Sequence, residues 1–208
     1  MTSKSLASLR ETAAECLERY TSPTGLYAFR TYDVQGDVDA PLMPSDILMA
    51  NLLSLKLGWK DVIPLFAEGE GPEQRLRTAL EAALGALRDA EPFESFETPE
   101  SLENAVSTLA EANAATETVE NWTPVTVSKV LHRRRAHIVP LNDSRVRDFY
   151  GVRPTQSKLL RKALWEDINE NADWLNELAS SKTTPDGRPL SLLRLADILI
   201  WMSYATSQ

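Results

Sequence analysis

Apolar residues recur every three or four positions along most of the chain, whereas alternation with a period of two is confined to short pieces. The longer spacing is typical of amphipathic α-helices. Helix start and stop signals accompany it, because Ser or Thr favours the N-cap, Pro the first turn and Gly the residue after a helix. The pattern predicts helices over residues 6–20, 45–58 with Ser45 as the cap and Gly58 as the stop, 72–90, from Thr98 and Pro99, 124–134 after Thr123, 155–181, and 189–206.

Two connections between these helices stand out. Residues 21–44 contain five helix breakers and no long apolar period, and a connection of that length in a compact domain is often functional. Residues 136–142, AHIVPLN, are predicted to be extended. A new helix is expected to begin immediately afterwards, at Asp143 or Ser144.

The last helix is apolar almost all round, interrupted by Arg194 and Asp197. It is too short to span a bilayer, so the pattern indicates a central core helix and no membrane span. We therefore expect one all-α domain over residues 1–208, folded in two lobes. One lobe is formed by about residues 21–120 and the other by residues 1–20 together with 121–208.

Charge is unevenly distributed along the chain. The net charge of −8 divides into −12 for residues 1–120 and +4 for residues 121–208. An acidic average disfavours general nucleic-acid affinity, because Lys and Arg supply most nonspecific binding to phosphates. The basic groups concentrate between residues 129 and 147, where Asp143 is the single acid. We predict phosphate contacts there, and the alternative is a solvated helix end; the candidate residues are Lys129, His132, Arg133, Arg134, Arg135, Arg145 and Arg147.

The sequence motifs of several enzyme classes are absent from this chain. Phosphate-binding loops, dinucleotide-binding glycine motifs, the nucleophile elbow and the zincin motif are absent. Two histidines five residues apart and the single Cys16 make a poor metal site, so neither a metal nor a cofactor is predicted. An unpaired cysteine and the lack of a secretory leader favour a cytoplasmic location.

The segment from Ser128 to Val146, SKVLHRRRAHIVPLNDSRV, resembles part of the helix-hairpin-helix DNA glycosylase superfamily, in which a helix leads through an apolar run into P-x-D-x-x-V. The chain is more similar to an uncharacterised bacterial family at the margin of that superfamily. That likeness extends to PSDILMANLLSLKL at residues 44–57 and SLLRLADILIWM at residues 191–202. The resemblance implies a glycosylase-like, two-lobed helical fold.

The resemblance also implies a role for Asp143 as the catalytic acid, at a helix N-terminus facing the sugar of an extruded nucleotide. Its carboxylate could stabilise the oxocarbenium-like charge or orient the attacking water. The residue could equally be an N-cap without a ligand, or serve both purposes.

Two family features have no counterpart in this chain. No glycine lies between Gly85 and Gly151, so the glycine-rich hairpin is missing and NWTPVTVSK, residues 121–129, takes its place. Bifunctional members carry a nucleophilic lysine inside that hairpin, and it has no counterpart here at Pro124 or Val125. The resemblance therefore implies a monofunctional enzyme.

Aromatic and charged residues in the long connection are candidates for the wall of a ligand pocket, and packing anchors are the alternative. Together with the tryptophan beside the hairpin position, they are Tyr27, Phe29, Arg30, Tyr32, Asp33 and Trp122. The sequence thus predicts a DNA glycosylase-like protein that hydrolyses the bond to a damaged or modified base, in DNA repair or defence against foreign DNA. DNA is the expected partner. The alternatives are a non-catalytic helical module binding nucleic acid or protein, and a small-molecule enzyme acting on a nucleoside or sugar phosphate.

Overall fold

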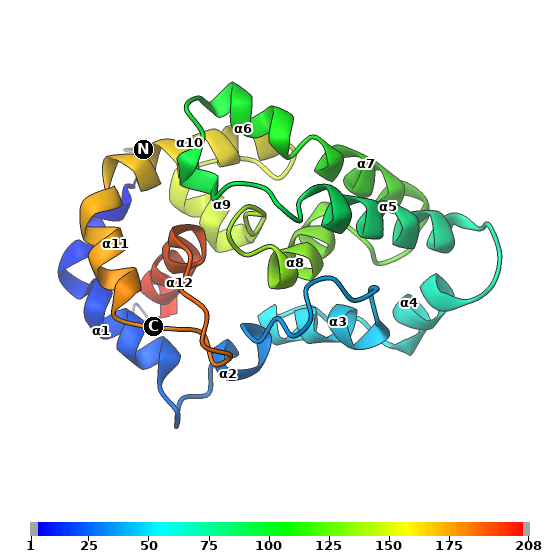
Figure 1. Cartoon of the computed structure of the whole chain (residues 1–208), viewed down its shortest axis with the longest axis horizontal. Helices are drawn as coiled ribbons and strands as arrows, with labels where there is room; N and C mark the ends of the chain where they lie inside the picture. The colour runs from blue at the N-terminus through cyan, green and yellow to red at the C-terminus, as the bar shows by residue number, and fades with distance from the viewer. Residues whose placement is uncertain (1–3, 206–208) are drawn as a thin grey trace.

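The structure is a computed structural model that describes residues 4–205, and in that range it is all-α, with no strand and one isolated bridge between Thr183 and Pro189. The predicted all-α class is confirmed. In order (Figure 1), the helices are η1 (Leu6–Leu9), α1 (Arg10–Thr21), α2 (Phe29–Tyr32), α3 (Pro44–Met49), η2 (Ala50–Leu53), α4 (Trp59–Val62), η3 (Ile63–Phe66), α5 (Pro72–Ala86), η4 (Phe93–Ser95), α6 (Pro99–Ala105), α7 (Thr108–Ala114), η5 (Ala115–Thr118), α8 (Pro124–Arg134), α9 (Ser144–Tyr150), α10 (Ser157–Glu170), α11 (Ala172–Ser180) and α12 (Leu192–Ala205), where η marks a 3₁₀ helix.

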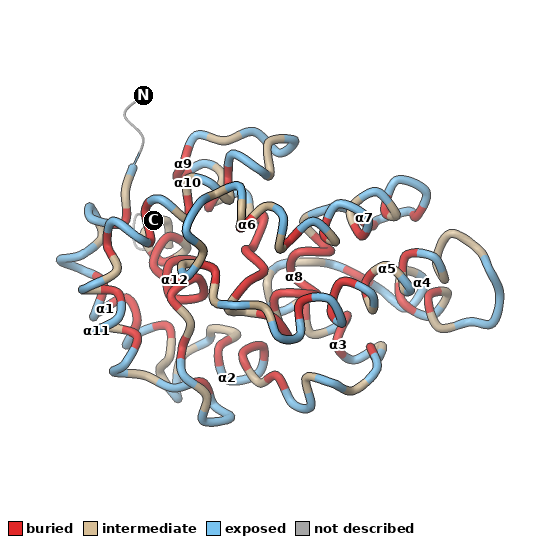
Figure 2. Tube along the Cα trace, turned by 45° about the horizontal axis from the view of Figure 1, so that its top comes forward, coloured by how far each residue is buried: buried red, intermediate tan, exposed pale blue. Residues whose placement is uncertain are grey.

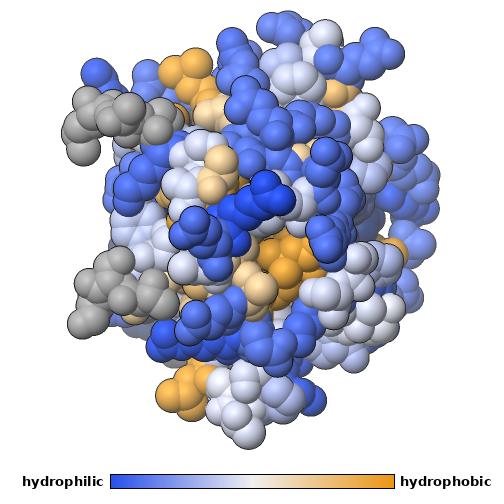
Figure 3. All heavy atoms as spheres, turned by 90° about the vertical axis from the view of Figure 1, so that its left-hand side faces the viewer, coloured by the Kyte–Doolittle hydropathy of each residue, from blue (hydrophilic) through white to orange (hydrophobic). Residues whose placement is uncertain are grey.

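Two buried helices organise the packing. Every residue of α12 from 192 to 200 is buried, and this helix contacts α1, α9, α10 and α11. The other central helix, α8, packs on α3, η2, α5 and α7. Figure 2 shows both as mostly buried, and the buried apolar residues of the two groups form one continuous cluster. The face on which α1 and α11 lie is largely hydrophilic, with a small apolar area in its middle (Figure 3).

The helix starts at Thr123 and Asp143 agree with the sequence prediction. The Thr123 hydroxyl accepts a hydrogen bond from the backbone N–H of Thr126, and Pro124 occupies the first turn of α8. Asp143 caps α9, and Gly151 ends that helix in the left-handed conformation. Between these helices, residues 136–138 form a turn, which differs from the predicted extended segment, and residues 139–142 have no regular secondary structure.

Other helix boundaries differ from the prediction. The connection over residues 21–44 contains the short helix α2. Ser45 is not the cap of the following helix, because Met43 takes that position and the Asp46 carboxylate accepts the Met43 N–H at 2.9 Å. That helical stretch ends at Ser54, in the left-handed conformation, and Gly58 begins α4 instead.

The long helix predicted over residues 155–181 is divided at Asn171. The side-chain N–H₂ of Asn171 donates to the backbone oxygen of Asp167 at 2.8 Å and to the carboxylate of Asp167 at 3.0 Å. The amide oxygen of Asn171 accepts the indole N–H of Trp174. These bonds hold the junction between α10 and α11. The final helix begins at Leu192 rather than at residue 189, and its predicted end at residue 206 lies outside the described residues.

Within residues 4–205 no helix is both long enough and apolar enough to cross a bilayer.

Two glycine substitutions should have opposite effects on stability. Gly151 has φ +66°, so Gly151→Ala should lower the free energy of unfolding by about 1 kcal/mol through backbone strain alone, since no atom lies within 4 Å of the added Cβ. Gly85 lies near the end of α5 with equally open space and without a positive φ, so Gly85→Ala should raise stability by about 0.5 kcal/mol. Urea denaturation of both variants measures the contrast, and equal effects would contradict this explanation.

Candidate active site

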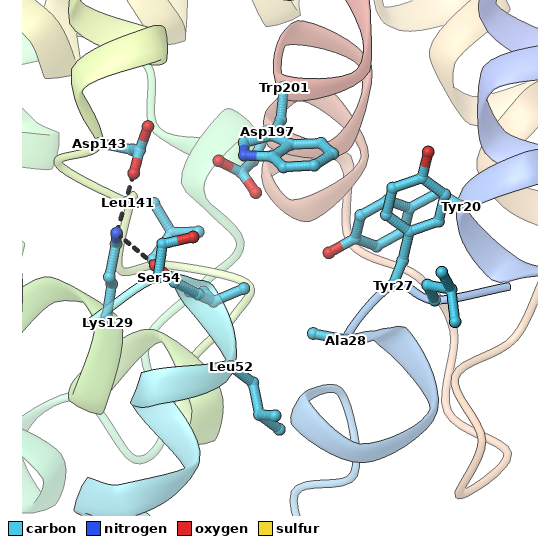
Figure 4. Close-up of a pocket in the computed structure, with 12 residues that line it drawn as sticks. Tyr20, Tyr27, Ala28, Leu52, Ser54, Lys129, Leu141, Asp143, Asp197 and Trp201 are labelled. Carbon is cyan, nitrogen blue, oxygen red and sulfur yellow. Dashed lines mark hydrogen bonds and ion pairs between the residues drawn. The ribbon is translucent and has the colours of Figure 1, made fainter. Parts of the chain in front are cut away.

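A pocket of about 230 Å³ opens where α1, the loop before α2, η2, α8, α9 and α12 meet. Figure 4 shows Lys129 and Asp143 on one side, Asp197 and Trp201 above, and two tyrosines opposite. The full lining is Tyr20, Leu26, Tyr27, Ala28, Leu52, Leu53, Ser54, Lys129, Leu141, Asp143, Asp197 and Trp201.

Asp143 is both a helix cap and part of the pocket wall. One carboxylate oxygen accepts the backbone N–H of Arg145 at 3.0 Å, and the other accepts from Lys129 Nζ at 2.9 Å. The Asp143 side chain is 19% exposed and the Lys129 side chain 5%. Lys129 also donates to the backbone oxygen of Leu53 at 2.7 Å. Burial acts to raise the pKa of Asp143, but Lys129 and the hydrogen bonds outweigh it, so the pKa is lowered and the carboxylate is ionised at neutral pH.

A second carboxylate, that of Asp197 on α12, lines the same pocket. Burial raises the pKa of Asp197 to about 6, against the opposing effect of Arg194, which donates to it at 2.5 Å. Arg194 also forms two hydrogen bonds with Asp33, at 2.7 and 2.8 Å, and one with the hydroxyl of Tyr20 at 3.1 Å. The pocket therefore contains two carboxyl groups whose pKa values are shifted in opposite directions, an arrangement that suits acid–base chemistry.

Three aromatic rings form an aromatic part of the pocket wall, with the two tyrosines opposite Lys129 and Trp201 between them and Asp197 (Figure 4). Tyr20 and Tyr27 stack with their centroids 5.2 Å apart, and Trp201 meets both edge-on, at 6.2 and 5.7 Å. The guanidinium of Arg145 lies 4.3 Å from the Trp201 ring centroid and donates to the backbone oxygen of Trp201. These packed rings offer apolar surface to a flat ligand.

The three consecutive arginines do not form a positive surface, which corrects their predicted phosphate contact. Arg133 and Arg134 bind the Asp46 carboxylate at 2.7 and 2.6 Å and also donate to backbone oxygens of the long connection. Arg135 is buried and donates to the backbone oxygens of Leu84 and Val38. Because the carbonyl groups of a loop need donors when they are buried, these arginines anchor residues 34–41 to α8.

The other predicted phosphate contacts are also engaged within the protein. Lys129 faces the pocket rather than the outer surface. His132 is fully buried, where its Nδ1–H donates to the Val139 oxygen at 2.6 Å, and burial lowers the pKa of His132 to about 3. Arg147 donates to the backbone and side-chain oxygens of Asn142. Buried, neutral His132 is therefore structural, and it stacks on Tyr32 with centroids 6.2 Å apart.

The residues predicted to line the pocket are dispersed. Tyr27 lines the pocket that contains Asp143, whereas Tyr32 and Asp33 border a separate cavity of about 240 Å³. Phe29 belongs to the core, and Arg30 is exposed on α2. Trp122 is buried, and its indole N–H donates to the Asp61 backbone oxygen at 3.0 Å.

Sequence reasoning missed Tyr20, Asp197 and Trp201. A signal for Asp197 was present, because a charged pair three residues apart interrupts an otherwise apolar helix, and Trp201 follows Asp197 by four residues on the same helix face. In the described part of the chain, no group of three or more His, Cys, Asp or Glu side chains is placed to hold a metal ion.

The family comparison covers almost the whole chain. Residues 13–204 match the model of a family of unknown function, DUF6308. No curated protein and no solved structure matched the chain. The matched region contains every residue of the pocket described above, and the chain belongs to the family of unknown function DUF6308.

Proposed function

We propose that the protein hydrolyses the N-glycosidic bond of a nucleoside unit held in the Asp143–Asp197 pocket. The observation that carries this proposal is the pair of carboxyl groups with oppositely shifted pKa values, both lining one pocket with an aromatic wall. The order of α8, apolar connecting segment and capping Asp143 supports it further, because a glycosylase-like arrangement requires that order. A helix-hairpin-helix glycosylase-like fold, with the turn at Asn121 in place of the glycine-rich hairpin, is part of the proposal.

Each pocket residue then has a distinct task. The base lies against Tyr20, Tyr27 and Trp201, which bind it through aromatic packing. Ionised Asp143 stabilises the positive charge that develops on the sugar as the carbon–nitrogen bond breaks. Lys129 and the Arg145 backbone N–H hold that carboxylate in place.

Protonated Asp197 donates its proton to the base nitrogen, which takes the bonding electron pair and leaves as a neutral base. Water adds to the anomeric carbon and gives up one proton, which passes through Asp143 to solvent. The products are a free base and a sugar with a hydroxyl group at that carbon.

The test compares Asp143→Asn with Asp148→Asn in a single-turnover assay of base release, using free nucleosides and oligonucleotides with modified or damaged bases. Asp148 is exposed on α9, the helix that Asp143 caps, and lies outside the pocket. We expect Asp143→Asn to slow base release roughly 10²–10³-fold, because the amide carries no negative charge. Asp148→Asn should keep the wild-type rate. Equal rates for wild type and Asp143→Asn would contradict the proposal.

A further inference from the structure

The pocket wall continues directly into an exposed surface segment. Leu52 and Ser54 line the pocket, and Ser54 has φ 66°, which turns the chain sharply at this point. Lys56 follows two residues later, so its Cα lies at most about 7.2 Å from that of Ser54. A long, exposed lysine side chain at this distance can reach a charged group attached to a ligand in the pocket. We call residues 52–63 the rim segment.

The charge of the rim segment differs from that of the chain around it. Lys56 and Lys60 are the only lysines between Lys4 and Lys129, in a half of the protein that is strongly acidic. Both are exposed, and neither forms an ion pair within residues 4–205. The one acid of the segment, Asp61, accepts hydrogen bonds from the Gly58 N–H and the Asn121 side chain. The segment thus carries a small positive charge on a surface that begins at the pocket, at Ser54, and continues away from it to α4 (Figure 1).

Apolar and aromatic side chains are exposed in the same segment. Trp59 is 71% exposed, and Leu52 and Ile63 are exposed as well. The ammonium group of Lys60 lies 5.5 Å from the Trp59 ring centroid. Exposed aromatic rings stack on nucleobases without sequence preference, and nearby cations contact the phosphates, which is the common chemistry of single-strand binding surfaces. A membrane-binding helix would instead need a long apolar face, whereas α4 has four residues.

We propose that the rim segment binds the polynucleotide strand whose nucleoside unit enters the pocket, with Lys56 contacting a phosphate close to that unit, and Lys60 and Trp59 contacting a phosphate and a base further along the strand. This inference rests on the proposed function and names its substrate as a nucleic-acid strand rather than a free nucleoside. It also moves the phosphate contact from the buried arginines of α8 to exposed lysines of the segment that follows Leu53, whose backbone oxygen Lys129 contacts.

The experiment measures binding of a short fluorescein-labelled single-stranded DNA by anisotropy over a range of salt concentrations, in the Asp143→Asn background so that no turnover occurs. Lys56→Gln with Lys60→Gln should reduce affinity at low salt roughly tenfold and make the slope of log affinity against log salt shallower by about 1.4, since each phosphate contact on a single strand contributes about 0.7. Trp59→Ala should weaken binding roughly tenfold.

The matched control is Lys158→Gln with Lys162→Gln, which removes the same charge from exposed positions on α10. The control should leave affinity and salt slope close to those of the parent. Equal losses in both double variants, or no loss in either, would overturn the inference. The inference would also be overturned if the rim variants weakened binding to phosphatidylserine vesicles and left binding to the DNA unchanged.

Failure of this inference can be distinguished from failure of the proposed function. The wild-type protein could release base from nucleosides while the rim variants bind the oligonucleotide as tightly as the parent. That result would contradict the strand assignment alone. Conversely, the rim variants could weaken oligonucleotide binding while the wild-type protein releases no base from any substrate. That result would contradict the hydrolytic function alone.

Discussion

Asp33→Ala is expected to lower the free energy of unfolding by about 3–5 kcal/mol, the largest stability effect predicted for a single substitution in this protein. Arg194 is fully buried, and Asp33 takes two of its hydrogen bonds, at 2.7 and 2.8 Å. Removing the Asp33 carboxylate leaves that guanidinium with Asp197 as its one anionic partner among residues 4–205. An incompletely neutralised buried cation is costly, and the loss is a large fraction of the stability of an ordinary domain.

The control for Asp33→Ala is Glu81→Ala, which breaks an ion pair with Arg77 on the surface of α5. Both side chains of that pair are about one-third exposed, so its loss should cost about 0.3–0.5 kcal/mol. Urea denaturation monitored by tryptophan fluorescence measures both variants. A loss below about 1 kcal/mol for Asp33→Ala would show that Arg194 finds solvent or another partner.

The second large effect concerns the pH dependence of base release. Asp197 must be protonated to donate to the leaving base, and its pKa is raised to about 6, so the acid form is depleted as the pH rises through that value. Asp143, whose pKa is lowered, remains ionised throughout this range. The wild-type rate should therefore fall above about pH 6, roughly tenfold for each further pH unit.

Asp197→Asn should remove this decline and reduce the maximal rate by roughly 10²–10⁴-fold, because an amide cannot serve as the proton donor. Asp148→Asn should keep the wild-type profile. The measurement is the single-turnover rate of base release between pH 5 and 8 for the three proteins. A flat wild-type profile, or the same alkaline decline in Asp197→Asn, would exclude Asp197 as the acid.

Local signals in the sequence predicted local structure correctly. The Thr123 and Pro124 pair begins α8, and Asp143 caps the next helix, because both features depend on neighbours within a few residues. The division at Asn171 was missed because it depends on side-chain hydrogen bonds to Asp167 and Trp174, which the apolar period does not encode. The all-α class was predicted from the spacing of apolar residues at every third or fourth position.

Long-range partners account for the errors at the candidate site. A run of arginines indicates an exposed positive face only when no internal acceptor is available, and here Asp46 and loop carbonyls some ninety residues earlier in the chain take that role. Asp143, which was predicted as the catalytic residue, lines the pocket. Asp197 lines it too, but it was treated as an interruption of a core helix. Only the packing of α12 against α9 and α1 brings Asp197 and Tyr20 to the same pocket as Asp143.

A double-mutant cycle on base release tests the central claim most directly, which is that Asp143 and Asp197 act together on one bond. Single-turnover rates would be measured for wild type, Asp143→Asn, Asp197→Asn and the double variant, on the best substrate of the nucleoside and oligonucleotide panel. Residues that act as a unit are strongly non-additive, so we expect the double variant to be about as slow as the slower single variant. Multiplicative losses, or no release of base by the wild-type protein from any member of the panel, would contradict the claim.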